Sequence, residues 1–580
     1  MTSLFTDPKG NNHAAGAHFA EPRPRHRTVL AHGSWRRVTR RIVCGLACAL
    51  TVSSLLMPSV SLAAEWVNVG GTQYNAGTAA GDEAGTWSWD GADDMKLNGY
   101  NGSAIEAEGK LNVSYSGNNT VTNDDGRGIQ VANGATEDAE LNIQGDASST
   151  LNVTSSGDAI WSEGDINIDG AGTVNATSIK EDAIDAEGDL TIKGSGNVNA
   201  TGDSDGIRAD GNVTIDNSGT VTAKATDDQG IDANENLTIK GGGKVEASSV
   251  KDEAIEADGN IEISGGSQVK ANSEEDYAVD AEGSLTVTNA SLNASGVGYG
   301  IYVYKGITLD GATVTVRAGA GSDEVIALYT DEDDIFIKNG STVDAFAEGK
   351  FSVAISTRNY YSNEAGGHIY ISDSVVKAIA RYAETGGDGP DHYSGDQDGE
   401  TIPESNGLNI GIFAQTYEGI TPATISIVRS KVTAEGDTAA IFALAMSEDG
   451  EAIGTIEIKD AIIQTPEGGK VIDYRHKEEL GDGVMYEAGQ TIGTGDAAID
   501  SPYNEAVAKK AVIAPPEETK PDSKPEGTKT TKTVAAATAG AKTAGTLAAT
   551  GDASSAAIAA TALAGTAVIA AGAVVSRKRS

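Results

Sequence analysis

The sequence has few residues that could form covalent or metal cross-links. It contains 2 cysteines in 580 residues, Cys44 and Cys48, and both lie in an N-terminal segment that we expect to be removed. The mature protein would then have no disulfide and no cysteine metal site. With 7 histidines and no Cys/His cluster, a zinc site is not expected either.

Proline, aromatic residues, helical periodicity and positive charge are also scarce. There are 13 prolines and 5% aromatic residues against 72 glycines, and the formal net charge is −42. Short apolar runs between Gly, Asn and Asp indicate many short strands joined by tight turns. The charge argues against nucleic acid and anionic lipid as partners, and it favours cations.

The first 63 residues have the features of a secretory signal peptide. An arginine-rich stretch precedes an apolar run over 42–62, and Ser61-Leu62-Ala63 offers the small residues that a signal peptidase needs. We therefore assign 1–63 to a signal peptide. Retention of this segment as a membrane anchor is the alternative.

The other end of the chain changes composition at about residue 501. Residues 501–546 are rich in Pro, Lys, Glu and Thr and predict a disordered spacer. Residues 547–580 contain an apolar run over 556–575 and a basic tail. Such a run is long enough to cross a bilayer, about 30 Å, with its basic end in the cytoplasm.

A short motif precedes the apolar run, namely Leu547, Ala548, Ala549, Thr550 and Gly551. Motif, apolar run and basic tail together resemble the cell-wall sorting signals of Gram-positive surface proteins, and LAATG is similar to the LAxTG variant. The resemblance implies cleavage between Thr550 and Gly551 by a sortase and transfer of Thr550 to peptidoglycan. A single-span anchor is the alternative. Both interpretations place the body of the protein outside the cell, with membrane contact only through this span.

The segment between these ends repeats about every two dozen residues. A central aliphatic residue recurs at Ile160, Ile184, Ile207, Ile231, Ile255, Val279, Ile301 and Ile326, with spacings of 22–25 residues. Each copy has three short alternating runs separated by Gly- or Asn-rich turns. A leucine-rich repeat fold is not expected, because the sequence lacks the consensus of those repeats. The pattern predicts an all-β fold, a right-handed parallel β-helix with about 23–24 residues and three strands per coil. We place it at 101–500, with loop insertions, behind a Trp-containing N-terminal cap at 64–100.

Acidic residues recur at fixed offsets from the central aliphatic residue. The set is Asp182, Asp185, Glu187, Asp205, Asp210, Asp228, Asp232, Asp252, Glu256, Asp258, Asp276, Asp280 and Glu282. In a strictly alternating strand, Ile184 would point inward, Asp185 outward and Ala186 inward. Stacked carboxylates repel, and Ca²⁺ prefers hard oxygen ligands, so these residues predict calcium sites. A solvated acidic face with diffuse counterions is the alternative.

The repeated pattern x-A-I-x-A-[DE]-G-x-[LVI]-x-I, found at 183–192, 206–215 and 254–263, resembles that of known surface proteins. These are the carbohydrate-binding, polysaccharide-lyase-like β-helix proteins of bacterial cell surfaces. The resemblance covers roughly residues 100–310 and extends more faintly to 475. It implies calcium-dependent binding of acidic or neutral plant polysaccharide without an established cleavage activity.

Tyrosines gather after the acidic copies. Tyr302 and Tyr304 take the outward positions that carboxylates hold one coil earlier, and Tyr329 follows one coil later at the offset of Tyr304. Stacked outward aromatic residues would form a platform for sugar rings, which makes these three tyrosines the predicted carbohydrate-binding residues. The alternative is that they cover the helix beneath nearby loops.

We therefore expect a secreted, wall-anchored protein of a Gram-positive bacterium that binds polysaccharide through a calcium-stabilised β-helix, without catalysis. A protein-binding or self-associating adhesin is an alternative. A polysaccharide lyase or glycoside hydrolase is a second one, since paired carboxylates and the candidate bases Lys305, Arg317, Arg358 and Arg381 are present. The acids recur once per coil instead of converging, which argues against it.

Overall fold

The structure is a computed structural model of the chain. It describes residues 2–6, 12–16, 64–135, 138–319, 324–359, 366–383, 409–417, 423–437, 439–446, 453–460, 462–464, 471–479, 483–492 and 510–515. All of them belong to one compact unit, Met1–Glu517. The described residues contain strands and turns but no helix.

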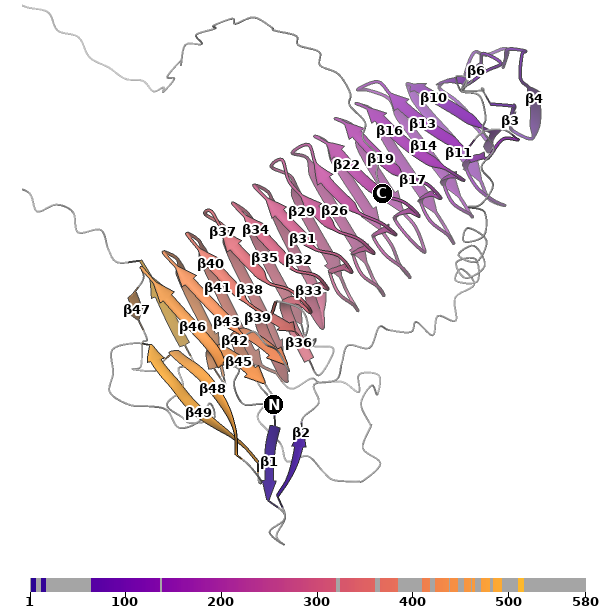
Figure 1. The fold of residues 1–580 in the computed structure, drawn as a ribbon. Coiled ribbons are helices and arrows are strands. Elements are labelled where there is room, and N and C mark those ends of the chain that lie inside the picture. Colours follow the sequence, from indigo (N-terminus) through magenta and orange to yellow (C-terminus); the bar gives the residue numbers. More distant parts are fainter. Residues whose placement is uncertain are drawn as a thin grey trace, which may run out of the picture. The chain divides into compact units, whose positions relative to one another are not determined.

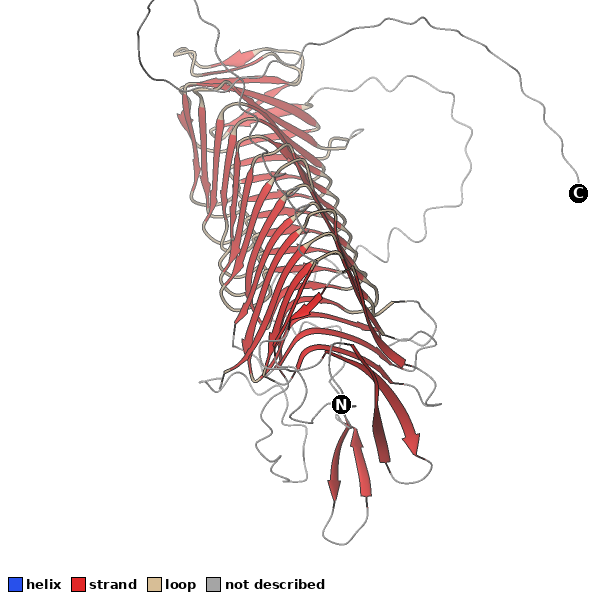
Figure 2. Ribbon diagram, turned by 90° about the vertical axis from the view of Figure 1, so that its left-hand side faces the viewer, coloured by secondary structure: helices blue, strands red, loops and turns tan. Residues whose placement is uncertain are grey.

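The predicted parallel β-helix is confirmed. The chain winds through three sheets in turn, and each strand pairs in parallel with the strand one coil before and one coil after it (Figures 1 and 2). Because strands three apart along the chain are neighbours, residues about two dozen positions apart lie side by side. Between Ile160 and Ile301 the coils are 22–24 residues long, as the sequence period predicts.

Sheet 1 contains the central aliphatic residues of the repeat. Its parallel strands are β9 (Ile105–Glu108), β12 (Ile129–Ala132), β15 (Ile160–Ser162), β18 (Ile184–Ala186), β21 (Ile207–Ala209), β24 (Ile231–Ala233), β27 (Ile255–Ala257), β30 (Val279–Ala281), β33 (Tyr299–Val303), β36 (Glu324–Thr330), β39 (Phe351–Asn359), β42 (Asn409–Tyr417) and β45 (Ala439–Met446).

Sheet 2 follows sheet 1 in every coil. Its parallel strands are β7 (Asp94–Asn98), β10 (Lys110–Ser116), β13 (Glu140–Gly145), β16 (Asp165–Gly170), β19 (Leu190–Gly194), β22 (Val213–Asn217), β25 (Leu237–Lys240), β28 (Ile261–Ile263), β31 (Leu285–Thr288), β34 (Ile307–Asp310), β37 (Ile335–Lys338), β40 (Ile369–Ser372), β43 (Thr424–Val428) and β46 (Ile453–Lys459).

Sheet 3 completes each coil. Its parallel strands are β8 (Asn101–Gly102), β11 (Asn118–Asn123), β14 (Thr150–Ser155), β17 (Thr173–Ser178), β20 (Asn197–Thr201), β23 (Thr220–Lys224), β26 (Lys244–Ser249), β29 (Gln268–Ser273), β32 (Ser291–Val297), β35 (Thr313–Gly319), β38 (Thr342–Gly349), β41 (Val375–Tyr382) and β44 (Lys431–Gly436).

The core is a column of aliphatic side chains from all three sheets. In one coil Ile184, Leu190, Ile192, Val198 and Ala200 are each at most 2% exposed, and the equivalent residues of neighbouring coils stack on them. Alternation along sheets 2 and 3 places every second residue in this core. Burying one such aliphatic side chain contributes about 1.5–3 kcal/mol, so the column is the main source of stability.

Antiparallel strands cover the first coils. In this part of the chain β3 (Trp66–Val69) pairs with β9 and with β4 (Thr72–Asn75), while β6 (Trp87–Trp89) pairs with β7 and with β5 (Ala80–Gly81). Trp87 and Trp89 are buried against the first coils. Because a parallel stack would otherwise expose its edge, this reversal of strand direction protects the edge from further pairing. A separate hairpin pairs β1 (Thr2–Thr6) with β2 (Asn12–Gly16).

The last coils are covered in the same way. Strand β50 (Lys510–Ala514) pairs antiparallel with β44 and with β47 (Ile462–Gln464), and β48 (Val471–Glu479) pairs antiparallel with β46 and with β49 (Gly483–Ile492). The prediction of a disordered spacer over 501–546 is wrong for this strand. Its alternation buries Ala511 and Ile513 in the core, so it behaves as a cap.

The turns after sheet 2 contain a column of left-handed residues. Asn289, Asn339, Asp373, Arg429 and Asp460 have φ between 46° and 56°. Asn and Asp tolerate this conformation, whereas an arginine rarely adopts it. Arg429 is held by Asp373 one coil earlier, because its Nε and Nη2 donate to the two carboxylate oxygens at 2.7 Å each.

One part of the predicted register is wrong. Ile301 pairs with Leu328, and Ile326 pairs with Tyr299, so Leu328 is the central aliphatic residue of that coil. The sequence VIAL offers two aliphatic residues two positions apart, and the period alone cannot choose between them. Further along, Leu328 pairs with Ile355, Ile355 with Ile412, and Ile412 with Ile441.

Candidate functional site: the outer face of sheet 1

Two consecutive residues point inward where the chain enters each strand of sheet 1. Ala183 and Ile184 both belong to the core, as does Ala186. The strand is therefore not strictly alternating at this corner. Asp182 and Asp185 flank the inward pair, so carboxylates three residues apart lie on the same outer face.

The corner accepts only very small side chains at the first inward position. Gly206 takes this place one coil after Ala183, and a Cβ on it would lie 2.6 Å from the backbone nitrogen of Lys224 and 2.7 Å from the carbonyl oxygen of Gly230. This close approach fixes how the chain turns into sheet 1. It therefore also sets the positions of the acidic residues that flank the inward pair.

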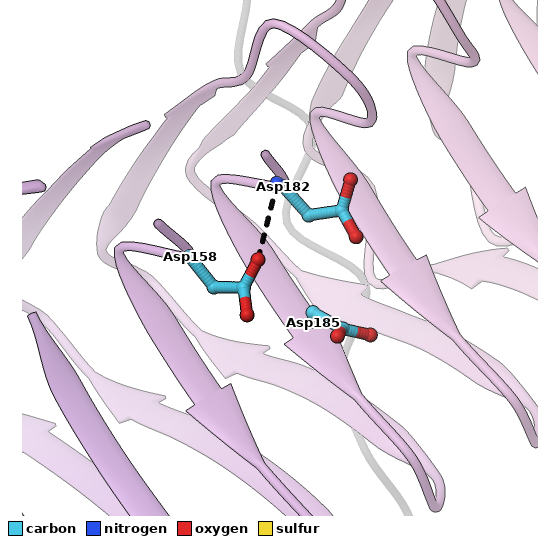
Figure 3. Close-up of side chains that lie close together, drawn as sticks. All are labelled: Asp158, Asp182 and Asp185. Atoms are coloured by element: carbon cyan, nitrogen blue, oxygen red, sulfur yellow. Dashed lines mark hydrogen bonds between the residues drawn. The ribbon is translucent and has the colours of Figure 1, made fainter. Parts of the chain in front are cut away.

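Three carboxylates converge on this face. Oxygen atoms of Asp158, Asp182 and Asp185 all lie within 4.8 Å of one another, and Figure 3 shows the three side chains gathered beside β15 and β18. We call them the first acidic cluster. Asp158 is not among the predicted ligands, although it lies at the offset of Asp182 one coil earlier.

Backbone amides hold these side chains in place. Asp158 Oδ1 accepts a hydrogen bond from the Asp182 N–H at 3.3 Å (Figure 3), and Asp182 Oδ1 accepts one from the Asp205 N–H at 2.8 Å. Asp205 Oδ1 continues the ladder by accepting from the Gln229 N–H at 2.7 Å. Each carboxylate is thereby oriented by the next coil, as in-register stacking requires.

Burial makes negative charge unfavourable here. Burial raises the pKa of Asp182 well above its usual range, and the nearby charges of Asp185 and Asp158 raise it further. Burial also raises the pKa of Asp185 to about 7, although Arg208 opposes the shift. The pKa of Asp205 is raised by burial and by Asp182. The face therefore favours either protons or a bound cation.

Arg208 neutralises the middle of the acidic column. Its Nη1 donates to Asp185 Oδ1 at 2.8 Å, its Nη2 pairs with Asp210, and its Nε lies 3.7 Å from Asp232 Oδ2. The carboxylates around it raise the pKa of Arg208 above its already high value, against the effect of burial. Arg208, which occupies the register position of Asp185, thus supplies positive charge to carboxylates of three successive coils.

A second acidic cluster lies further along the same face. Oxygen atoms of Asp252, Glu253 and Asp276 lie within 4.8 Å of one another. Glu253 accepts a hydrogen bond from Gln229 Nε2 at 3.2 Å, and burial together with Asp252 raises its pKa well above the usual range. The uncharged Gln229 and the cationic Arg208 lie between the two clusters, so the carboxylates form two separate groups.

The remaining predicted ligands lie on the same face at different depths. Buried or half-buried positions hold Asp228, Asp232, Glu256, Asp280 and Glu187, whereas Asp210, Asp258 and Glu282 are exposed where the strands end. Asp210 accepts a hydrogen bond from Asn234 Nδ2 at 2.9 Å. The structure brings together Asp182 with Asp185 and Asp252 with Asp276; it adds Asp158 and Glu253 to them.

The tyrosines follow the acidic positions but do not form the predicted platform. Tyr302 pairs with Tyr329, so the predicted alignment of Tyr329 with Tyr304 is wrong. Tyr329 is 0% exposed, and its hydroxyl donates to Asp331 Oδ1 at 2.6 Å. Its ring lies 5.4 Å from the rings of Tyr299 and Tyr302. The ring of Tyr329 therefore cannot serve as an open surface for sugars.

Tyr329 instead belongs to a second apolar cluster, on the outer face of sheet 1. Its buried members are Tyr299, Ile326, Tyr329, Val353, Ile410, Phe413, Ala439 and Phe442. Tyr302 and Tyr304 are half-buried, and the hydroxyl of Tyr304 donates to Glu332. For Tyr329 the interpretation as a covering residue is correct. Sugar binding by Tyr302 and Tyr304 stays a prediction.

Three of the candidate catalytic bases are engaged away from the acidic clusters. Arg317 Nη2 lies 3.1 Å from Asp344 Oδ2, and Arg381 Nη2 lies 2.7 Å from Glu435 Oε1. Arg358 is buried, with its guanidinium 5.6 Å from the ring centre of Tyr329. Lys305 is exposed.

The predictions for the two ends of the chain stay predictions. Most of the assigned signal peptide 1–63 and the whole sorting signal 547–580 lie outside the described residues. Among the residues that the structure describes, there is no helix long and apolar enough to cross a membrane.

The described chain is thus a parallel β-helix with two acidic clusters and a group of tyrosines along one sheet. Residues 104–374 match the model of a family described as "Carbohydrate-binding domain-containing protein". Both acidic clusters and all three predicted tyrosines fall within this range. No curated protein and no solved structure matches the chain.

Proposed function

We propose that the protein is a non-catalytic, polysaccharide-binding surface protein whose β-helix is stabilised by calcium. The observation that carries the binding function is the family match over residues 104–374, since the description of that family names carbohydrate binding. The match covers the coils from β9 to β40. Binding would therefore be a property of the β-helix itself.

The first acidic cluster supports the calcium part of the proposal. Ca²⁺ binds oxygen ligands at about 2.3–2.6 Å, so two ligand atoms on opposite sides of one ion lie roughly 4.6–5.2 Å apart. Oxygens of Asp158, Asp182 and Asp185 all lie within 4.8 Å of one another, which is close enough for them to share one such ion. A cation there would offset the unfavourable charge that raises the pKa of Asp182 and Asp185. The second cluster offers a similar set of ligands.

The surroundings of Arg208 favour binding over catalysis. A lyase needs a base close to the acidic groups, and the described arginines that contact them are Arg127, whose Nε donates to Asp158 Oδ2 at 2.7 Å, and Arg208. The guanidinium of Arg208 is engaged by Asp185, Asp210 and Asp232, and these carboxylates raise its pKa. An arginine held this firmly in its charged form is a poor proton acceptor.

The location of the protein is part of the proposal. The features of 1–63 and 547–580 support export and covalent attachment to peptidoglycan. An anchored β-helix would present its coils outside the wall. Incubation with the matching sortase, followed by mass spectrometry, would show a new C-terminus at Thr550; an uncleaved chain would overturn the anchoring.

A glycan array with the purified protein tests the central proposal. We expect binding to polysaccharides in the presence of calcium and weaker binding in EDTA. Thermal melting should show a higher Tm in calcium than in EDTA for the wild type. Asp158→Asn/Asp182→Asn should reduce this difference, because only the second cluster is left intact. Asp216→Asn is the control, because Asp216 is exposed on sheet 2, belongs to neither cluster and is not among the predicted calcium ligands.

Three results would each overturn one part of the proposal. A folded protein that binds no polysaccharide in either condition would refute the binding function. An identical Tm in calcium and EDTA would refute structural calcium. Formation of unsaturated product from polygalacturonate, followed by absorbance, would refute the non-catalytic assignment.

A further inference from the structure

Two aromatic residues interrupt a column of mostly short polar side chains along the outer face of sheet 2. In-register positions along this face hold Thr191, Thr214, Thr238, Glu262, Thr286 and Thr308. The next coil places Phe336 beside Thr308, and the coil after that places Tyr370 beside Phe336. Ser426 follows Tyr370 and returns the column to a short hydroxyl side chain.

The two rings form a stack that faces solvent. Their centroids are 5.1 Å apart and their planes differ by 11°, so they stack along the direction in which the coils add. Phe336 is 38% exposed and Tyr370 is half-buried. By contrast, Tyr329 on sheet 1 is fully buried. Since Thr308 and Ser426 carry no ring, the stack ends on both sides over short side chains.

Polar groups flank the stack along the strands. Two residues before the rings, Asp334 Oδ1 accepts a hydrogen bond from the His368 N–H at 3.0 Å. Two residues after Phe336, Lys338 Nζ lies 3.6 Å from Asp310 Oδ2. Side chains two positions apart share a face at roughly 6.5–7 Å spacing. Donors and acceptors therefore lie on both sides of an apolar centre, within reach of a bound ring.

Two ion pairs lie near the stack. Lys338 pairs with Asp310, and two coils after Tyr370 Lys459 Nζ pairs with Glu457 Oε2 at 2.7 Å. The chain as a whole carries a net charge of −42, which repels polyanions. An uncharged ligand is therefore favoured over a polyuronate at this place.

We propose that Phe336 and Tyr370 form a binding site for a neutral hexose polysaccharide on the outer face of sheet 2. The inference depends on the proposed polysaccharide-binding function and names its site and ligand class. The apolar C–H face of a pyranose ring packs on the exposed ring surface, as amphipathic ligands do on aromatic side chains. Its hydroxyl groups meet Lys338, Asp310 and His368. The site lies within the range 104–374 that matches the carbohydrate-binding family.

The test compares the wild type with Phe336→Thr/Tyr370→Thr by affinity gel electrophoresis. One gel contains the neutral polymer hydroxyethyl cellulose, a second contains polygalacturonate, and both contain calcium. Threonine is chosen because it occupies this column at position 308 and in four earlier coils, so the fold is expected to tolerate it. Val375→Thr is the control, since Val375 is an exposed apolar residue on sheet 3 (46%).

We expect the neutral polymer to retard the wild type and Val375→Thr equally, and the double variant to bind about tenfold more weakly or not at all. Tm values measured in parallel should agree, and Phe336→Tyr, which keeps the ring, should retain binding. Wild-type strength in the double variant would overturn the site, as would retardation of the wild type by polygalacturonate alone. Absence of retardation in both gels, together with a glycan array without any binding, would overturn the proposed function itself.

Discussion

Replacement of Arg208 by methionine should destabilise the β-helix far more than replacement of a comparable surface arginine. Arg208 binds Asp185 at 2.8 Å and approaches Asp232 to 3.7 Å, and the side chains of these two acids are 10% and 5% exposed. Its third partner, Asp210, is 39% exposed and contributes little. Removal of the cation leaves two buried carboxylates without their main counter-charge.

The size of the loss follows from the burial of these acids. Removing one partner of a buried ion pair costs about 3–5 kcal/mol, because the remaining charge is left in a poor solvent. Arg429 is the matched control. It makes an equally short bidentate contact with Asp373, but the two side chains are 53% and 44% exposed. For Arg429→Met we therefore expect a loss of about 0–1 kcal/mol.

Urea unfolding in EDTA, followed by circular dichroism, measures both variants. Because a stacked repeat does not unfold in one cooperative step, hydrogen exchange of the amides in β18, β21 and β24 provides a local readout. Arg208→Met/Asp185→Asn should recover a large part of the loss, since the amide carries no charge. A loss below about 1 kcal/mol for Arg208→Met, equal to that of Arg429→Met, would refute the reasoning.

Three further predictions concern pH, packing and the cap. In EDTA, the Tm of the wild type should fall between pH 5 and pH 8 relative to that of Asp185→Asn. The pKa of Asp185 is raised to about 7 from 3.8, so in this range the folded state holds a proton that the unfolded state has lost. This stabilisation disappears as the pH rises through 7. A wild-type Tm that rises with pH relative to that of Asp185→Asn would contradict the shift. Gly206→Ala should lower stability by about 1–3 kcal/mol in urea unfolding, because its Cβ would lie 2.6 Å from a backbone nitrogen, whereas Gly126→Ala, with nothing closer than 3.3 Å, should not. Ile513→Asp should detach β50 from β44 and increase self-association in light scattering, since Ile513 is fully buried; a monomeric, equally stable variant would show that β50 is not a cap.

Much of the fold could be predicted because the period of the sequence is the period of the structure. Each coil repeats its inward aliphatic residues at the same offsets, so Ile184 identifies the places of Ile160 and Ile207. The prediction fails where two aliphatic residues satisfy the same pattern. At Ile326 and Leu328 only the pairing with Tyr299 and Ile301 decides, and that pairing depends on how β33 enters the sheet.

The candidate site was harder to predict because it depends on a corner. Strict alternation cannot place Asp182 and Asp185 on one face, whereas two inward residues in succession do so. The interruption by Arg208 was visible in the sequence, but its contacts with three acids require the register of three coils. Phe336 and Tyr370 are 34 positions apart, across a coil with an insertion, so no fixed period brings them together.

The ladder of aspartate side chains, each accepting the amide of the following turn, has a consequence for how such a chain can change length. Each aspartate of this ladder contacts only the coils next to it, so excising the stretch from Asp205 to Asp228 as one block would bring Asp182 beside Gln229. The cut would also remove Arg208 and its contacts with Asp185 and Asp232. The length of the β-helix can therefore change by whole coils. Removing one coil brings the groups on either side of the cut closer together by the spacing of one coil.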